Sequence, residues 1–335
     1  MENQVPEYSR MLEQMLLPTS DRFLKLIGMI VSPEEARLLL AMPGQPYDLS
    51  QRLGLPLDIT DEMIRVLYFK GLAFPSPKTD PPTWRMARDF VQLHDATILW
   101  PDAPQAFLDQ WQDIMENEWP ALAEKFSQLM PRPFTRVIPV GVAVQADTQV
   151  LSYENVHEMI DQAKTLAVTK CTCRLTAHKC DRPLEACLQV NKAAQYSINR
   201  GTGREVSKEE ALEILKKAEE EGLIHVTMNK HQVDHFICNC CPCCCQTMPI
   251  LIKGGIRVID PSRFQAKVDR EVCIACGACL ERCYFGALQP DEEEKTLVTG
   301  DKCLGCGLCR VVCPSGAITL EAVRPAEFVP EKYFS

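Results

Sequence analysis

The chain has 335 residues, of which 46% are hydrophobic and 24% charged, and its formal net charge is −9 at pH 7. This composition is typical of globular proteins with packed cores and excludes the disordered and fibrous classes. The acidic balance argues against a surface that binds nucleic acid or anionic membranes. The length predicts two to three domains at roughly 100–200 residues each.

The N-terminus has no basic segment followed by an apolar one, and no apolar run approaches the roughly 18 residues of a membrane span. We therefore expect a cytoplasmic protein without a membrane span. All 18 cysteines lie between Cys171 and Cys313. Cytosolic thiols stay reduced, so clustered cysteines there indicate metal ligands or redox groups rather than disulfides.

Residues 1–102 predict a winged helix-turn-helix. Ser32 and Glu35 form a capping box that begins the first helix, Gly54 ends the second, and Gly71 ends the third. A two-stranded wing is expected over 72–74 and 83–86.

This expected fold often binds DNA, but its charge argues for another role. Residues 1–100 contain 10 Lys and Arg against 13 Asp and Glu, and the expected recognition helix opens with Asp61 and Glu62. Phosphates would repel these carboxylates. Protein docking or a structural role is therefore favoured over nucleic-acid binding.

Residues 103–255 predict a cysteine-rich α/β domain that follows a helical linker. A helix or helix pair is expected over 107–130, and strands over 137–144 and 166–169. Helices are expected over 152–164, capped by Ser152, and over 207–221.

Ten cysteines of this middle domain fall in two dense groups, which predict a metal centre. Packing does not explain six cysteines in eight residues, and thiols this close oxidise readily. We expect one or more iron–sulfur clusters here, with a zinc site as the alternative and His225, His231 and His235 as further possible ligands. The cysteines are Cys171, Cys173, Cys180, Cys187, Cys238, Cys240, Cys241, Cys243, Cys244 and Cys245.

Residues 256–335 contain the strongest motif, a C-x2-C-x2-C-x3-C run that begins at Cys273 and repeats from Cys303. This spacing resembles bacterial two-cluster ferredoxins, in which the fourth cysteine of each repeat binds the other cluster. The resemblance implies two [4Fe-4S] clusters in a ferredoxin-like domain. It implies these ligands: Cys273, Cys276, Cys279 and Cys313 for the first cluster, and Cys303, Cys306, Cys309 and Cys283 for the second. Tyr284 stands where the family usually has proline.

The whole chain also resembles a group of anaerobe iron–sulfur proteins with an N-terminal winged helix. The matching segments are Cys171-Thr-Cys173-Arg174, residues 181–188 and the Cys-Asn-Cys-Cys-x-Cys-Cys-Cys run over 238–245. The resemblance implies electron transfer in anaerobic metabolism, with no assigned reaction. The three parts of the chain together predict an α+β multidomain protein.

The sequence thus predicts an electron-transfer protein or oxidoreductase subunit. Electrons would pass between two C-terminal [4Fe-4S] clusters and the middle-domain centre, with redox proteins or oxidoreductase subunits as partners. Two alternatives stay open: an enzyme that reduces a substrate at the middle-domain centre, and a redox-sensing transcription regulator. No group of acidic and basic side chains stands out beside the cysteines, so the sequence identifies no catalytic residues.

Overall fold

The computed structural model describes residues 5–76, 78–141, 150–232 and 235–332, which form two compact units. The first unit comprises residues 1–119 with 175–177, and the second comprises the remainder. The three-domain division at residues 102 and 255 stays a prediction. Among the described residues, no helix combines the length and apolarity needed to cross a bilayer.

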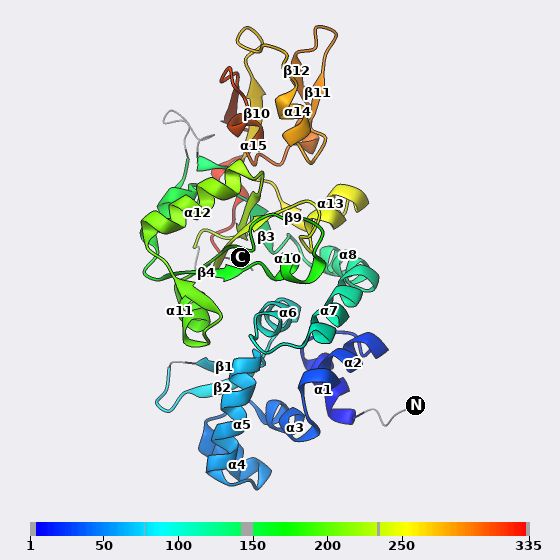
Figure 1. Ribbon diagram of the computed structural model, residues 1–335, viewed down its shortest axis with the longest axis vertical. Coiled ribbons are helices and arrows are strands. Elements are labelled where there is room, and N and C mark those ends of the chain that lie inside the picture. The colour runs from blue at the N-terminus through cyan, green and yellow to red at the C-terminus, as the bar shows by residue number, and fades with distance from the viewer. Residues whose placement is uncertain (1–4, 77, 142–149, 233–234, 333–335) are drawn as a thin grey trace. The chain divides into compact units, whose positions relative to one another are not determined.

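The first unit is helical with one hairpin (Figure 1). Its core surrounds Trp111, a fully buried side chain whose ring packs edge-on against Phe23, Phe90 and Phe107. Trp119 stacks on Phe90 and is also buried, so both tryptophans are core residues, as predicted. Its elements are α1 (Pro6–Gln14), α2 (Asp21–Ile30), α3 (Pro33–Ala41), α4 (Pro46–Leu53), α5 (Leu57–Lys70), β1 (Ala73–Ser76), β2 (Thr83–Met86), α6 (Phe90–Ile98) and α7 (Gln105–Asn117).

The helices and hairpin expected within residues 33–86 are present, although one begins earlier. The Ser32–Glu35 capping box is formed, and β1 pairs with β2 in antiparallel fashion. Helix α5 starts at Leu57 rather than Thr60, because the Thr60 side chain bonds back to the Pro56 carbonyl inside the first turn. The winged-helix arrangement of these elements stays a prediction.

The second unit is built on a seven-stranded sheet of order β6-β4-β5-β8-β7-β3-β9. All of its neighbouring strands pair antiparallel except β3 and β9, which are parallel. The strands are β3 (Thr135–Val137), β4 (Leu166–Lys170), β5 (Glu185–Val190), β6 (Gly203–Glu205), β7 (Ile224–Met228), β8 (Phe236–Cys240) and β9 (Ile259–Asp260). The helices that precede or connect them are α8 (Trp119–Leu129), α9 (Val156–Gln162), α10 (Thr172–Ala177), α11 (Lys192–Asn199), α12 (Lys208–Glu220) and α13 (Met248–Gly254). The first residue of α8 and the last three of α10 belong to the first unit.

Two predictions for the second unit need correction, one for a strand and one for a helix. The strand expected over 137–144 ends at Val137, because the Val140 amide bonds to the Cys306 carbonyl instead of to a strand, and residues 142–149 lie outside the described part. The helix expected from Ser152 begins at Val156, since Asn155 accepts the His157 amide and acts as the cap. The predicted helix pair is confirmed as α7 and α8.

The C-terminal part of this unit consists of two small antiparallel sheets and two short helices (orange to red in Figure 1). Strand β10 (Phe264–Val268) pairs with β13 (Ile318–Ala322), and β11 (Leu288–Pro290) pairs with β12 (Thr296–Val298). Helices α14 (Ala278–Arg282) and α15 (Leu308–Val311) follow the cysteine turns.

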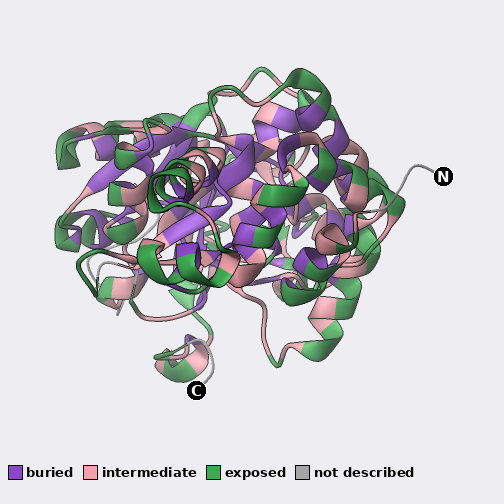
Figure 2. Ribbon diagram, turned by 90° about the horizontal axis from the view of Figure 1, so that it is seen from below, coloured by how far each residue is buried: buried purple, intermediate pink, exposed green. Residues whose placement is uncertain are grey.

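One apolar core joins this C-terminal part to the seven-stranded sheet. Val226 of β7 and Met248 of α13 belong to the same buried cluster as Phe264, Ile318 and Leu320. Buried residues, purple in Figure 2, mark such interiors, and exposed residues, green, lie on outward helix turns and loops. Because the core is shared, the C-terminal part and the sheet stabilise each other.

Candidate metal centres

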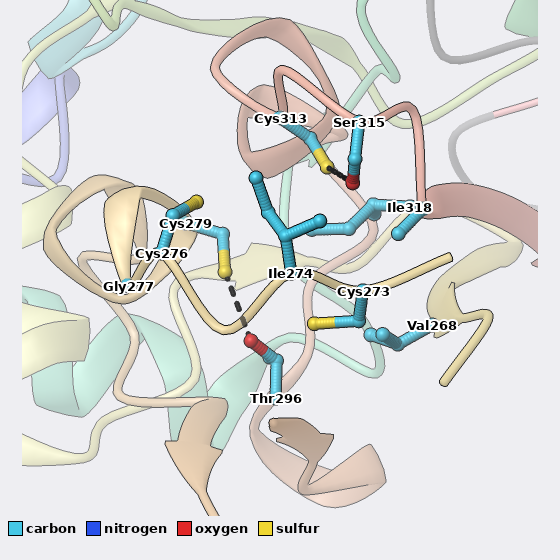
Figure 3. A pocket seen from close by; sticks show the side chains of 11 residues that line it. Val268, Cys273, Ile274, Cys276, Gly277, Cys279, Thr296, Cys313, Ser315 and Ile318 are labelled. Atoms are coloured by element: carbon cyan, nitrogen blue, oxygen red, sulfur yellow. Dashed lines mark hydrogen bonds between the residues drawn. The ribbon is translucent and has the colours of Figure 1, made fainter. Parts of the chain in front are cut away.

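The eight cysteines of the repeats line two separate pockets. Each pocket is lined by three cysteines of one repeat and one cysteine of the other. Four thiols around one pocket match the ligand set of a [4Fe-4S] cubane, so the residues present fit that group. The first ferredoxin pocket holds Cys273, Cys276, Cys279 and Cys313 (Figure 3), and the second holds Cys283, Cys303, Cys306 and Cys309.

Tight turns bring three cysteines of each repeat together. Gly277 and Gly307 have φ of +74° and +76°, and each precedes the short helix that carries the third cysteine. Gly305 also has positive φ, and a Cβ built there would lie 2.1 Å from the Phe264 carbonyl oxygen. Only glycine tolerates both the positive φ and the close approach to the Phe264 carbonyl at this position.

Hydrogen-bond donors surround the sulfurs of both pockets. In the second pocket the amides of Ala266 and Ala287 donate to Cys303 and Cys283 Sγ, at 3.5 and 3.4 Å. In the first pocket, the Cys279 and Cys313 sulfurs lie near hydroxyl groups that dashed lines mark in Figure 3. Such bonds stabilise the extra negative charge of a reduced cluster and so raise its reduction potential.

Removing the Thr296 hydroxyl should lower the potential of the first cluster. Thr296 Oγ1 lies 3.2 Å from Cys279 Sγ, and the residue is buried. If the bond strengthens by about 1 kcal/mol on reduction, its loss shifts the potential by about 40 mV, since about 59 mV per electron corresponds to about 1.4 kcal/mol. We expect this shift in Thr296→Val by EPR-monitored redox titration. Thr296→Ser, which keeps the hydroxyl, should titrate as the wild type, and an unchanged potential in Thr296→Val would contradict the assignment.

Burial keeps several of these thiols protonated until metal binds. It raises the pKa of Cys306 to about 12 and also raises the pKa of Cys279. A thiol must lose its proton to become an iron ligand, so cluster assembly releases protons here.

In the middle of the chain, the inner strands β4, β5 and β8, with the segments that follow β4 and β8, bring six cysteines together. Cys238 and Cys240 lie on the same face of β8, with Asn239 on the other. The β5–β8 register places Leu188 opposite Ile237, so Cys187 of β5 stands opposite Cys238. Cys171 follows the β4 strand that pairs with β5.

The sulfurs of these cysteines form a closed sequence of contacts, which we call the six-cysteine ring. Cys171 contacts Cys173 and Cys187, and Cys173 also contacts Cys245. Cys240 contacts Cys245 and Cys238. The Cys238–Cys187 contact then closes the ring. Six thiols at one place are donors of the soft type that iron–sulfur clusters and zinc both use.

The other four middle cysteines form a separate, compact four-cysteine group, whose sulfurs all lie within 4.8 Å of one another. Cys180 Sγ is 4.0 Å from Cys241 Sγ and 3.7 Å from Cys244 Sγ. Cys243 and Cys244 Sγ are 3.8 Å apart. The ten middle cysteines, for which the sequence leaves the number of metal centres open, therefore divide into sets of six and four.

Two arginines balance the charge of these thiols. Buried Arg174 bonds to the Asn239 carbonyl at 3.1 and 3.2 Å and reaches the Cys241 side chain. Burial alone would lower the pKa of Arg174, but the surrounding thiolates, Cys171 foremost, raise it above its ordinary value. Arg182 donates to Cys243 Sγ at 3.7 Å and to the Tyr284 hydroxyl at 3.2 Å.

The three histidines considered as ligands occupy different settings. His225 is fully buried, with Nδ1 2.5 Å from Asn239 Oδ1 and Nε2 3.2 Å from Glu219 Oε1. His231 Nε2 lies 2.9 Å from the Val329 carbonyl, and His235 contributes its backbone carbonyl to the Val190 amide. The ring nitrogens of His225 and His231 therefore face hydrogen-bond partners in the protein.

Two residues that contact cysteine sulfurs were not predicted from the sequence. Arg182 contacts Cys243 of the four-cysteine group, and Thr296 contacts Cys279 of the first ferredoxin pocket. Arg182 lies two residues after Cys180, and a basic residue this close to a ligand is a usable signal. Thr296 is remote in sequence from Cys279, and only the β11–β12 hairpin places it there.

A family model for the 4Fe-4S dicluster domain matches residues 266–320. The match contains all eight cysteines of the repeats and shows an iron–sulfur domain of the electron-transfer type in this part of the chain. No curated protein and no solved structure matches the chain.

Proposed function

We propose that this protein is a cytoplasmic electron-transfer protein, or a subunit of an anaerobic oxidoreductase, with two cubanes and a third redox centre at the six-cysteine ring. The crossed ligand sets are those that line the two ferredoxin pockets. The clusters supply one-electron chemistry when bound. The chain's own residues hold them, exclude water and set their potentials through hydrogen bonds to sulfur.

The exposure of the two pockets supports an order for the electron path. Cys276 of the first pocket is exposed, and the neighbouring Ile274 is 63% exposed. Cys303 and Cys309 of the second pocket are buried. The first cluster is thus the point at which a redox partner protein exchanges electrons, and the second lies on the path inward.

The observation that carries the proposal is the apolar core that the ring shares with the ferredoxin pockets. Cys245 is buried in the same cluster of side chains as Cys303 and Cys309 of the second pocket and Cys279 of the first, and Cys238 and Cys240 pack against it. The Val140 amide bonds to the Cys306 carbonyl at 2.9 Å, which attaches the second pocket directly to the chain that follows β3. A buried apolar core limits the access of solvent, which favours electron transfer between redox centres over transfer to solvent.

For the N-terminal unit we propose a winged helix that docks protein partners rather than DNA. Helix α5 presents exposed Asp58, Asp61 and Glu62. Its Arg65 is held by Glu62 at 2.7 Å, which removes a cation that a phosphate would need.

A second candidate function, reduction of a substrate at the ring, is favoured by the thiol count. A cubane binds four terminal thiolates, and the ring offers six. Buried His225, which bonds to Glu219 and to Asn239, lies on the face of the sheet opposite to Cys238 and Cys240, so the thiol count alone supports this candidate.

EPR of the fully reduced, anaerobically purified protein tests the proposal. We expect three paramagnetic centres, with magnetic coupling between the third and one cubane because of the shared core. Cys187→Ser should remove the third signal and its coupling and leave both cubane signals. A wild-type spectrum of two cubanes alone would show that the ring is not a redox centre.

A further inference from the structure

The sulfur spacing in the four-cysteine group is too short for a cubane. A tetrahedral ion about 2.3 Å from each thiolate separates the sulfurs by about 3.8 Å. The contacts measure 3.7, 3.8 and 4.0 Å, and every pair is within 4.8 Å. A cubane carries its terminal thiolates on four irons at separate corners of a cube, which holds them farther apart.

The local hydrogen bonds also fit a single ion with four thiolates. Backbone amides of Arg182, Cys244 and Lys179 contact the sulfurs of Cys180, Cys241 and Cys244, respectively. Three of the four cysteines lie in one turn over residues 241–244, outside the sheet. Hydrogen bonds from these amides, rather than strand pairing, therefore hold the sulfurs in place.

The charge balance points to the same ion. Four thiolates around one divalent cation have a net charge of −2. The Arg174 side chain reaches Cys241, and the Arg182 side chain donates to Cys243, so two cations face two of the four sulfurs. Charge-assisted bonds of this kind stabilise a buried anionic centre.

We propose that Cys180, Cys241, Cys243 and Cys244 bind one zinc ion as a structural site distinct from the six-cysteine ring. The ion fastens the loop that carries Cys180 to the turn that follows β8. Arg182 extends this attachment to the C-terminal part, because it also bonds to Tyr284 next to Cys283 of the second pocket. Tyr284, which stands where two-cluster ferredoxins usually have proline, supplies the hydroxyl group that accepts this hydrogen bond. The inference does not depend on the proposed electron path.

Metal analysis of paired variants of the full chain, purified without oxygen, tests the assignment. We expect about one zinc per wild-type chain, by the one-ion-per-four-thiolates logic. Cys243→Ser should lose the zinc and keep the ring iron, whereas Cys240→Ser, a neighbouring cysteine in the ring, should lose ring iron and keep the zinc. Loss of both metals from both variants would mean one shared centre and would overturn the division.

Zinc-edge X-ray absorption of the wild-type protein gives a second test that does not require any variant to fold. The expected spectrum has four sulfur neighbours at about 2.3 Å and no metal neighbour. Nitrogen or oxygen ligands, or a zinc-free protein with extra iron and sulfide in these four cysteines, would overturn the zinc site. An iron–sulfur cluster found there would leave the proposed electron-transfer function standing, so the two failures are distinguishable.

Discussion

Replacing Cys306 with alanine is expected to remove one ferredoxin cubane, with about four iron atoms and their sulfide. Cys306 lines the second pocket together with Cys283, which comes from the other repeat. Cys283→Ala should therefore remove the same cluster as Cys306→Ala. Iron and sulfide content, with the EPR signal that each variant retains, measures the effect.

The first pocket supplies the matched control. Cys276→Ala should remove the other cubane and leave the signal that Cys306→Ala abolishes, because Cys276 lines only the first pocket with its partner from the second repeat, Cys313. If Cys283→Ala destroyed the cluster of Cys273, Cys276 and Cys279 instead, the crossed ligand sets would be wrong.

Gly305→Ala is expected to disrupt the second pocket nearly as severely as loss of a ligand. The new methyl would lie 2.1 Å from the Phe264 carbonyl oxygen and 2.2 Å from Ser262 Oγ. The φ of +65° adds strain of about 1–3 kcal/mol for a residue with a side chain. The turn must then move away from β10, and we expect loss of this cluster's iron and a lower unfolding temperature in anaerobic calorimetry.

The equivalent position of the first repeat provides the comparison. Ala275 already has a φ of +55° with its methyl accommodated. Ala275→Gly removes a side chain from a left-handed conformation and should retain both clusters. If Gly305→Ala also retained both clusters and the wild-type unfolding temperature, the close approach to Phe264 would not constrain the turn.

The ferredoxin spacing predicts from local information which cysteines should lie together. Each repeat places three cysteines in one turn, and the repeat itself indicates where the fourth belongs. Capping signals are equally local, so the Ser32–Glu35 box begins α3 as expected. Predictions are less accurate where contacts between residues far apart in the sequence determine the structure. The Val140 amide, for example, bonds to the Cys306 carbonyl, and the strand therefore ends early.

The division of the middle cysteines is not readable from their order in the chain. Cys243 and Cys244 belong to one set and Cys245 to the other. Strand pairing decides this, because β5 next to β8 places Cys187 opposite Cys238, whereas the loop carrying Cys180 reaches the turn over 241–244. The role of Arg182 depends on the same long-range packing.

Iron and acid-labile sulfide per chain, measured on anaerobically purified protein, test the central claim most directly. The two ferredoxin cubanes account for about eight irons. The six-cysteine ring predicts iron well above that number with matching sulfide, and Cys187→Ser should reduce the content to about eight without affecting the zinc. A wild-type protein with about eight irons and no more would contradict a redox centre in the middle of the chain.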